Sequence, residues 1–309
     1  MSRPCKIGIQ LPEVEREVAW PEVIAMACRA EAIGFDSLWV GDHLLYDLPG
    51  GVTRGPWEAW TSLAAIAAVT TRIELGPLVA STSFHAPAML AKQAATVDAI
   101  SGGRLIVGLG AGWNEREYRA FGFEYDRRVS RFAEAFTIIK TLLREGRIDF
   151  AGEFYRVENC VLDPAPVRAG GPPLMIGSVG ERMLSIGLPH VDAWNVWWSQ
   201  FANTAAGFAA VKDRVGERCA AVGRDPASVE ATAAVYVQLD GGGGRVMGSY
   251  HRDQIAPIRG SSQEIAEQLE QFARAGASHL QLVVDPINQA SIESLGEVLE
   301  LLDRGDIQT

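Results

Sequence analysis

Short apolar runs alternate along the chain with longer amphipathic segments. The runs with strand-like composition lie at residues 6–10, 37–40, 73–79, 105–109, 174–176, 192–196, 229–237 and 279–284. Between them, apolar positions recur every three or four residues, which is the spacing of one helix face. These helical segments lie at 20–33, 57–69, 87–102, 129–143, 181–186 and 203–221, with two more after Ser261 and from 291 to 302. The pattern therefore predicts eight strands, each followed by a helix.

Strict alternation of strands and helices implies parallel strands joined by right-handed crossovers. Eight such units close into a barrel more readily than into an open sheet. We therefore predict a (β/α)8 TIM-type barrel, organised as a single domain over residues 1–309, with insertions at the C-terminal face of its strands. The extra length is expected in three segments, 111–128, 146–173 and 240–260, and the second of these is expected to be irregular or a small hairpin.

Composition narrows the function classes. The chain is 48% hydrophobic and 21% charged, which is typical of a globular protein with a large core. Its formal net charge of -10 argues against a nucleic-acid partner, since a polyanion requires a dense basic face. The four cysteines are scattered, and no metal-ligand spacing is present, so we expect a cytoplasmic protein without a metal site. No signal peptide or membrane-spanning segment is expected.

The segment 101–117, SGGRLIVGLGAGWNERE, leads from a predicted strand through alternating glycines into a helix. Such a turn can present backbone N–H groups to an anion. A dinucleotide-binding fingerprint does not fit, because this is the fourth strand and the spacing is GxGxG. A second glycine turn, Gly177 to Gly180, ends the next strand, so two adjacent loops predict a phosphate cradle. Glycines that only ease packing remain the alternative.

Asp42 and His43 follow the second predicted strand, on the face where barrel enzymes hold their active sites. A histidine there can act as an acid or base near neutral pH, and a neighbouring carboxylate can orient it. The alternative is a histidine that is merely hydrogen-bonded within a loop. His279 opens a strand and is expected to be structural. Three tryptophans that follow strand ends are expected to wall a flat apolar pocket: Trp113, Trp197 and Trp198.

Several segments together resemble the bacterial luciferase-like monooxygenase family, and within it the branch that uses the deazaflavin coenzyme F-420. The resemblance covers nearly the whole chain. The segments that carry it are GFDSLWVGDH at 34–43, RIELG at 72–76, 87–105 ending in SGGRL, GLGAGWNE at 108–115, PPLMIG at 172–177 and DAWN at 192–195.

The resemblance implies a barrel that binds a flavin-like ring at the C-terminal ends of its strands. Asp42 and His43 would contact the ring, with His43 as proton donor or acceptor, and Leu78 and Val79 would form a bulge behind it, often with a non-proline cis peptide. Some members carry a glutamate directly after the GxG turn where this chain has Trp113, which argues against a sugar-phosphate substrate. The resemblance implies that further residues bind the cofactor: Gly110, Ala111, Gly112, Trp113, Gly177, Ser178, Val179 and Gly180.

The leading hypothesis is an F-420-dependent oxidoreductase that transfers a hydride between the cofactor C5 and a small organic substrate. A two-component monooxygenase that uses reduced FMN and dioxygen is the alternative, and a non-catalytic flavin-binding barrel is the third. The resemblance also implies a homodimer and a separate flavin or deazaflavin reductase as partners. Substrate contacts are expected on loops 44–55 and 241–260. The candidates to bind the carboxylate-bearing tail of F-420 are Arg116, Arg119, Arg182, Arg252 and Arg259.

Overall fold

The computed structural model describes residues 3–244 and 255–305, and in this part of the chain nine strands form one sheet. The strand order is β5-β2-β1-β13-β12-β11-β10-β7-β6. The two end strands, β5 (Glu74–Pro77) and β6 (Ala80–Ser81), belong to one chain segment that is interrupted only by residues 78 and 79. The order therefore returns to its starting point, and the sheet closes as a barrel of eight strand positions. The predicted TIM-type barrel is confirmed.

The barrel strands pair in parallel and lie close to the predicted runs. Those other than β5 and β6 are β1 (Lys6–Gln10), β2 (Ser37–Val40), β7 (Val107–Gly110), β10 (Leu174–Gly177), β11 (Ala193–Trp197), β12 (Glu230–Gln238) and β13 (His279–Asp285). Every residue of β13 is buried, as expected for a strand that is covered on both faces. The fourth strand begins two residues later than predicted, because Leu105 makes only an isolated bridge with Leu75.

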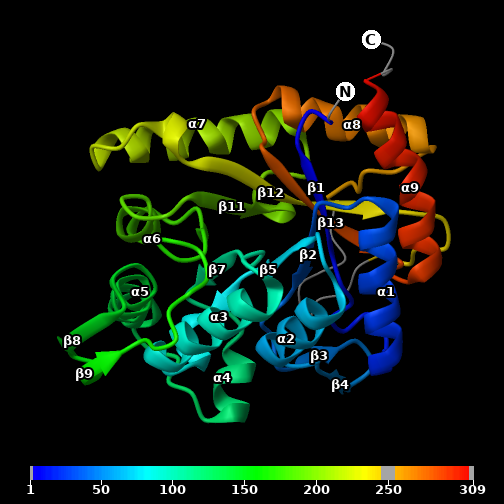
Figure 1. Ribbon diagram of the computed structural model, residues 1–309. Helices are drawn as coiled ribbons and strands as arrows, with labels where there is room; N and C mark the ends of the chain where they lie inside the picture. The colour runs from blue at the N-terminus through cyan, green and yellow to red at the C-terminus, as the bar shows by residue number, and fades with distance from the viewer. Residues whose placement is uncertain (1–2, 245–254, 306–309) are drawn as a thin grey trace.

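Helices surround the barrel (Figure 1) and correspond to the predicted amphipathic segments. They are α1 (Trp20–Ile33), α2 (Ala59–Val69), α3 (Pro87–Ser101), α5 (Arg128–Glu145), α6 (Glu181–Gly187), α7 (Ala205–Ala221), α8 (Ser262–Arg274) and α9 (Gln289–Arg304). Ser261 and Glu264 form a capping box at the start of α8, which is the helix predicted after Ser261. Helix α2 starts two residues later than predicted, because the Glu58 carboxylate caps the N–H groups of Trp60 and Thr61.

The insertions add local structure outside the barrel. Helix α4 (Glu115–Phe121) follows β7, and an antiparallel hairpin of β3 (Tyr46–Leu48) and β4 (Val52–Arg54) follows β2. This hairpin is not predicted from the sequence, in which residues 44–55 were expected to form a loop. Of the two alternatives for 146–173, irregular structure or a small hairpin, the structure shows the hairpin, formed by β8 (Arg147–Ala151) and β9 (Arg156–Val161). This hairpin follows helix α5 rather than a strand. Only its tip lies toward the C-terminal face of the barrel, where the insertion was predicted, and there Glu153 pairs with Arg127. The segment 245–254 of the third predicted insertion lies outside the described residues.

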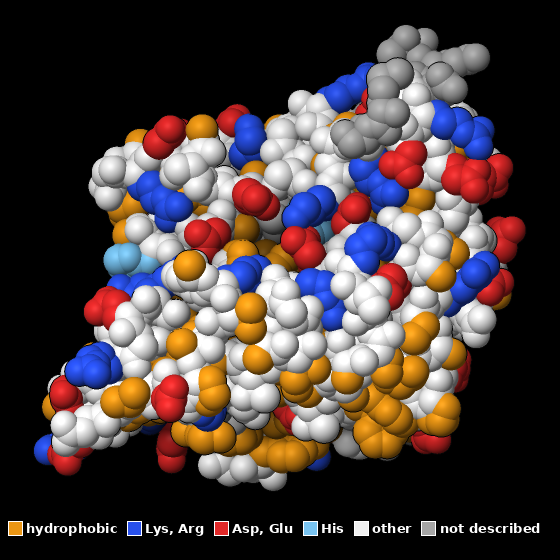
Figure 2. All heavy atoms as spheres, viewed as in Figure 1, with side chains coloured by type: hydrophobic (Ala, Val, Ile, Leu, Met, Phe, Trp, Pro, Cys, Tyr) orange, Lys and Arg blue, Asp and Glu red, His pale blue; other side chains and the backbone are white. Residues whose placement is uncertain are grey.

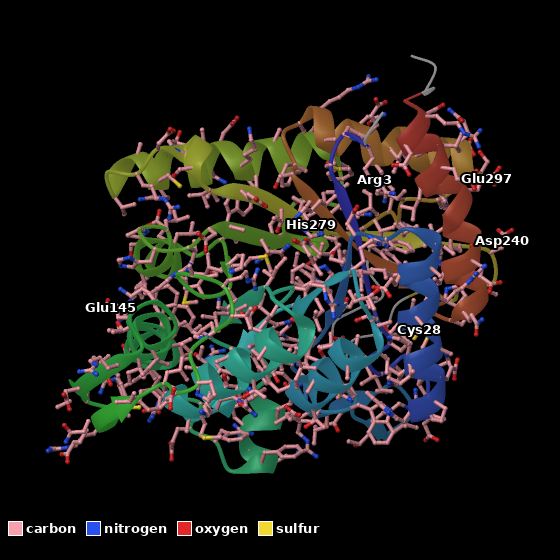
Figure 3. All side chains as sticks on the ribbon, in the orientation of Figure 1. Arg3, Cys28, Glu145, Asp240, His279 and Glu297 are labelled. Atoms are coloured by element: carbon pink, nitrogen blue, oxygen red, sulfur yellow. The ribbon has the colours of Figure 1, made fainter. Side chains whose placement is uncertain are left out.

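His279 lies buried inside the barrel (Figure 3), where it contacts Ser37 and Trp39. Its Nε2 lies 2.7 Å from Ser37 Oγ, which also accepts a hydrogen bond from Trp39 Nε1 at 2.7 Å. Burial, with a smaller contribution from Lys6, lowers the pKa of His279 to about 3. The ring is therefore neutral and structural, as predicted.

Acidic and basic side chains are interspersed over the face seen in Figure 2, and apolar side chains gather in its lower part. Among the described residues, no helix combines the length and apolar character that crossing a membrane requires.

Candidate functional site

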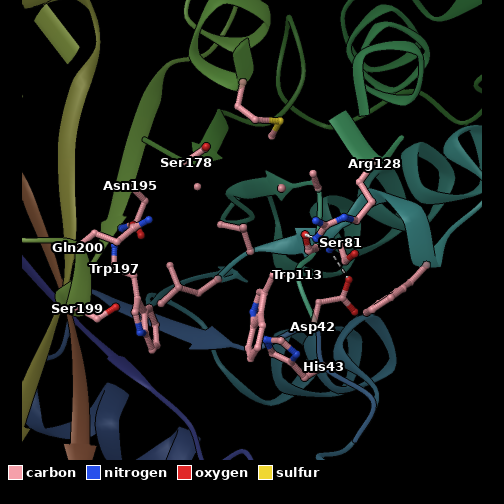
Figure 4. A pocket seen from close by; sticks show the side chains of 18 of the residues that line it. Asp42, His43, Ser81, Trp113, Arg128, Ser178, Asn195, Trp197, Ser199 and Gln200 are labelled. Atoms are coloured by element: carbon pink, nitrogen blue, oxygen red, sulfur yellow. Dashed lines mark hydrogen bonds between the residues drawn. The ribbon is translucent and has the colours of Figure 1, made fainter. Parts of the chain in front are cut away.

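A cavity of about 700 Å³ lies at the C-terminal ends of the barrel strands (Figure 4), within the size range of small-molecule sites. It receives residues from the ends of β2, β7, β10 and β11 and from the segment between β5 and β6. Val179 and Gly180, which precede α6, are not in its lining. The predicted site residues that line it are Asp42, His43, Leu78, Val79, Gly110, Ala111, Gly112, Trp113, Gly177 and Ser178.

The Leu78-Val79 peptide bond is cis, as the resemblance implied, and interrupts the third barrel strand. The Val79 side chain packs directly against the glycines of two neighbouring strands. A Cβ atom at Gly177 would lie 2.7 Å from Val79 Cγ2, and one at Gly110 would lie 2.8 Å from the same atom. Close packing against Val79 therefore explains these two glycines, and their role as a phosphate cradle stays a prediction.

Gly112 has a different reason to be glycine. Its φ is 71°, in the left-handed region, and a Cβ there would lie 2.2 Å from the Tyr118 hydroxyl and 2.3 Å from Ser81 Oγ. Tyr118 donates a hydrogen bond to the Ala111 carbonyl at 2.7 Å. The turn after β7 is thus held in place by the Tyr118 side chain of α4.

Asp42 is held by the segment that follows the bulge. Its Oδ2 accepts a hydrogen bond from the Ser81 backbone N–H at 2.8 Å and lies 2.8 Å from His85 Nε2. Burial by itself would lower the pKa of His85, but the hydrogen bond and the charge of Asp42 raise it, and the net pKa lies above the ordinary value. Asp42 and His85 therefore form an ion pair whenever the imidazole is protonated.

His43 is paired with a different carboxylate, Glu117 of α4. His43 Nδ1 lies 3.1 Å from both carboxylate oxygens of Glu117, whose side chain is fully buried. The prediction that Asp42 orients His43 is therefore wrong, because the Asp42 carboxylate is directed to Ser81 and His85. Burial opposes protonation of His43, but Glu117, with smaller contributions from Glu13 and Asp42, raises its pKa above the ordinary value.

Glu117 is not predicted from the sequence as a partner of His43, although it lies in the segment 101–117. An acidic residue in the first turn of a helix is normally interpreted as part of the cap. Glu117 is the third residue of α4, after Asn114 at the N-cap, so its pattern suggests a local role. His85 was missed as well, since its pairing with Asp42 joins residues that are distant in the sequence.

Aromatic side chains form the walls of the cavity, as predicted for Trp113, Trp197 and Trp198. Trp113 and Trp197 both line the cavity, and Figure 4 shows their indoles with a gap between them. The Trp113 ring contacts His43 edge-on, with 5.6 Å between ring centroids. Trp198 packs beside Trp197 and against Tyr236. The arrangement leaves a largely apolar space between flat surfaces, next to an imidazole.

One arginine lines the described part of the cavity, Arg128 at the start of α5. Its Nη1 donates to the Gly112 carbonyl at 2.8 Å, and its guanidinium lies 4.0 Å above the centre of the Tyr125 ring. Of the arginines singled out from the sequence, those that the structure describes do not line the cavity. Arg116 pairs with Asp47, Arg119 with Glu115, and Arg182 donates to Ser130, while Arg259 is exposed and Arg252 lies outside the described residues.

Comparisons with known proteins agree on one family. The sequence profile of the luciferase-like monooxygenases matches residues 6–252. The pyrimidine monooxygenase RutA of Cronobacter sakazakii is 27% identical over 264 residues, which are 80% of this chain and 74% of that protein. The F-420-dependent glucose-6-phosphate dehydrogenase of Amycolatopsis mediterranei is 34% identical over 164 residues, 49% of this chain and 48% of that protein.

A solved structure extends the likeness to the whole fold. An F-420-dependent secondary alcohol dehydrogenase, in complex with an F-420-acetone adduct, superposes with a TM-score of 0.80. The alignment covers 98% of this chain and 99% of the other, at 19% identity. At that identity the likeness shows the fold alone.

Proposed function

The chain belongs to the luciferase-like monooxygenase family, and from this premise we propose that it is an oxidoreductase that uses coenzyme F-420. It would transfer a hydride between the cofactor and a small, uncharged organic substrate. The observation that carries the proposal is the His43 imidazole, which lines the cavity beside Trp113 and is backed by the buried Glu117. Reduction of a C=O or C=N bond by hydride needs an accompanying proton, and an imidazole with a raised pKa can supply it.

The residues present fit a ring cofactor with a phosphate-bearing tail. The cavity is large enough for a tricyclic ring and a small substrate together, and Trp113 and Trp197 offer flat apolar surfaces. At the other side, Arg128 and the backbone around Gly112 and Ser178 provide groups that suit a phosphate. When bound, reduced F-420 supplies the hydride.

The residues of the chain would bind the ring, transfer the proton and exclude water. Asp42 would hold the polar edge of the ring, and Leu78 and Val79 would support its face from the bulge. His43 would hold or accept a proton at Nε2, the ring nitrogen that is not engaged by Glu117. The tryptophans would exclude water, so that the polar contacts act in a medium of low dielectric constant.

The charges around the cavity favour a neutral substrate. Among the described residues, three acidic side chains line it, Glu13, Asp42 and Glu117, while Arg128 lies where we place the phosphate. An anionic substrate placed near His43 would be repelled by these carboxylates. Ketones, enones and imines of modest size are the substrate classes that the walls suit.

The alternative is an FMN-dependent monooxygenase that receives reduced flavin from a separate reductase and consumes dioxygen. The relative that supports it is the pyrimidine monooxygenase, which aligns with 80% of this chain. The third hypothesis, a barrel that binds a flavin without catalysis, gains no support from the ordered pairing of His43 with Glu117.

The deciding experiment titrates the purified protein, without oxygen, with F-420 and separately with FMN. Oxidation of reduced F-420 is then followed anaerobically against a panel of ketones, enones and imines. Binding of F-420 and substrate-dependent oxidation without oxygen support the proposal. Binding of FMN alone, with oxygen-dependent product formation in the presence of a reductase, would establish the FMN-dependent monooxygenase. Binding of either cofactor without turnover would favour the hypothesis of a barrel that binds a flavin without catalysis.

A further inference from the structure

Glu117 reaches from helix α4 into the loop that carries His43. We propose that Glu117 is a positioning residue, which fixes the His43 imidazole with its proton on Nδ1 and leaves Nε2 toward the cavity. The inference rests on the proposed function only in assigning proton transfer to Nε2. The arrangement of the imidazole itself is a property of the protein alone.

The contacts of Glu117 define a site for an ionised carboxylate. Oε1 accepts hydrogen bonds from the backbone N–H groups of Leu44, at 2.6 Å, and Leu45, at 3.2 Å. Both carboxylate oxygens lie 3.1 Å from His43 Nδ1. Two of the three partners are N–H donors that cannot change roles. A carboxylate held by two fixed donors therefore requires the third partner, His43 Nδ1, to carry hydrogen.

The other acidic groups near His43 do not take this place. Asp42 Oδ2 is occupied by Ser81 N and His85 Nε2, and Glu13 Oε1 accepts from Gln10 Nε2 at 2.8 Å. The charges of both residues raise the pKa of His43. The imidazole plane is set by two rings, Tyr46 at 4.8 Å and Trp113 at 5.6 Å between centroids.

Glu117 also links two insertions of the barrel. Glu117 of α4 contacts Leu44 and Leu45, in the loop that follows His43. A second residue, Asn114 at the N-cap of α4, donates from Nδ2 to the Leu45 carbonyl at 3.1 Å. Arg116 of the same helix pairs with Asp47 at the start of the β3–β4 hairpin. The position of His43 is therefore tied to the turn after β7, which carries Gly112 and Trp113, and not only to its own strand.

Replacement of the carboxylate by an amide should reverse the tautomer. In Glu117→Gln the amide oxygen can still accept from Leu44 and Leu45, so its NH2 group faces His43 Nδ1. Nδ1 must then act as acceptor, and the hydrogen of the neutral imidazole moves to Nε2. The loss of the negative charge also lowers the pKa of His43, since Glu117 is its largest favourable partner.

The test is ¹⁵N NMR of histidine-labelled protein without any cofactor, with His43 assigned by its absence from the His43→Asn spectrum. We expect wild-type His43 to carry hydrogen on Nδ1 when neutral. Glu117→Gln should shift it to the Nε2–H tautomer and lower its pKa. Glu117→Asp keeps the charge and should retain the Nδ1–H form. The matched control is Glu115→Gln, because Glu115 is on the same helix but is partly exposed and pairs with Arg119.

A neutral wild-type imidazole with hydrogen on Nε2 would overturn the proposal, as would an unchanged tautomer and pKa in a folded Glu117→Gln protein. If that variant does not fold, the wild-type and Glu117→Asp spectra decide. Since these spectra need no cofactor, they are independent of whether F-420 binds. Once a substrate is known, Glu117→Gln should reduce kcat by on the order of 10²- to 10⁴-fold with little change in the KM for cofactor. Glu115→Gln should leave both unchanged.

Discussion

His85 Nε2 lies 2.8 Å from Asp42 Oδ2, although the two residues belong to different strand ends of the barrel. The same oxygen accepts a hydrogen bond from the Ser81 N–H, so the carboxylate is anchored to the segment that follows the Leu78-Val79 bulge. Asp42 is nearly buried, with 3% of its side chain exposed, and His85 is the cation that can balance its charge. The relationship makes the stability of this edge of the cavity depend on the protonation of His85.

We predict that the stabilising effect of His85 falls as the pH rises. The folded protein raises the pKa of His85 above its unfolded value of 6.5, so protonation of His85 favours folding. This stabilisation is complete below pH 6.5 and is lost as the pH rises through the pKa of the folded state. His85→Gln keeps a hydrogen-bond donor but removes the charge. The difference in free energy of unfolding between wild type and His85→Gln should be greater at about pH 5.5 than at about pH 9, by on the order of 1 kcal/mol.

Urea denaturation of both proteins at the two pH values measures this difference, and effects common to both proteins cancel. His190→Gln provides the opposite case, because burial and nearby cations lower the pKa of His190, so its protonation opposes folding and the pH dependence of the difference should have the opposite sign. An equal difference between wild type and His85→Gln at both pH values would contradict the ion pair.

The contact between Gly177 and Val79 predicts strong coupling between two substitutions. Gly177→Ala places a Cβ 2.7 Å from Val79 Cγ2 and should reduce the free energy of unfolding by about 1–3 kcal/mol. In a Val79→Ala background the methyl groups that oppose it are gone, and most of that cost should disappear. A double-mutant cycle of denaturation midpoints should therefore give a coupling energy of roughly 0.5–3 kcal/mol.

A glycine without close neighbours provides the control for this cycle. A Cβ at Gly296 in α9 would meet nothing within 4 Å, so Gly296→Ala should stabilise the helix by about 0.5–1 kcal/mol and should not couple to Val79. Additive effects of Gly177→Ala and Val79→Ala would show that the bulge adapts to the extra atom.

The barrel was predictable because its elements follow from local periodicity. Amphipathic helices such as α1 and α8 are specified by their own apolar spacing and by end signals such as Gly34 and Ser261. Strand ends were less certain, since they depend on the neighbour: Leu105 looks like strand but pairs only at one bridge. The β3–β4 hairpin was missed because its strands are only three residues long.

The candidate site was predictable only where it follows strand ends. Asp42 and His43 were found because the residues after a barrel strand point to the active-site face. Their partners, Glu117 and His85, were not, since each contact bridges two separate segments and depends on side-chain direction. Adjacent position in the sequence suggested a pair of Asp42 with His43, whereas the fold gives each of them another partner.

Arg104 of the SGGR segment is predicted to stabilise the fold without acting on a ligand. Its guanidinium donates to three carbonyls at and beyond the end of α2, those of Ala67, Thr70 and Ile73, at 2.6 to 2.9 Å. A lysine cannot reproduce this planar set of donors. Arg104→Lys should therefore reduce the free energy of unfolding by about 1.5–3 kcal/mol and leave cofactor affinity unchanged.

Arg119→Lys is the control for Arg104→Lys. Arg119 is an exposed residue of α4 in an ion pair with Glu115, and its replacement should change stability by less than about 0.5 kcal/mol. A stable Arg104→Lys protein with weakened cofactor binding would contradict the structural role.

Arg128 is predicted to bind the phosphate of the cofactor. Its guanidinium lines the cavity and is held by the Gly112 carbonyl and the Tyr125 ring, so it is already positioned before a ligand arrives. Arg128→Met preserves most of the packing on Tyr125 but removes the charge. Because hydrogen bonds to charged groups contribute about 1.5–3 kcal/mol, the dissociation constant of the phosphate-bearing cofactor should rise by roughly 10- to 100-fold.

The decisive comparison uses pairs of ligands with and without the phosphate. FMN and riboflavin differ only in this group, whereas the deazaflavin riboside lacks the carboxylate-bearing tail of F-420 as well. Fluorescence titration of wild type and Arg128→Met with FMN and riboflavin, or with F-420 and its deazaflavin riboside, separates the phosphate contact from the ring contact. The variant should lose affinity for the phosphate-bearing member of whichever pair binds, and should bind the other member as wild type does. Salt should also weaken binding less in Arg128→Met than in wild type, because a charge interaction has been removed. Equal losses for both members would assign Arg128 to the shape of the turn after β7 and would place the phosphate elsewhere.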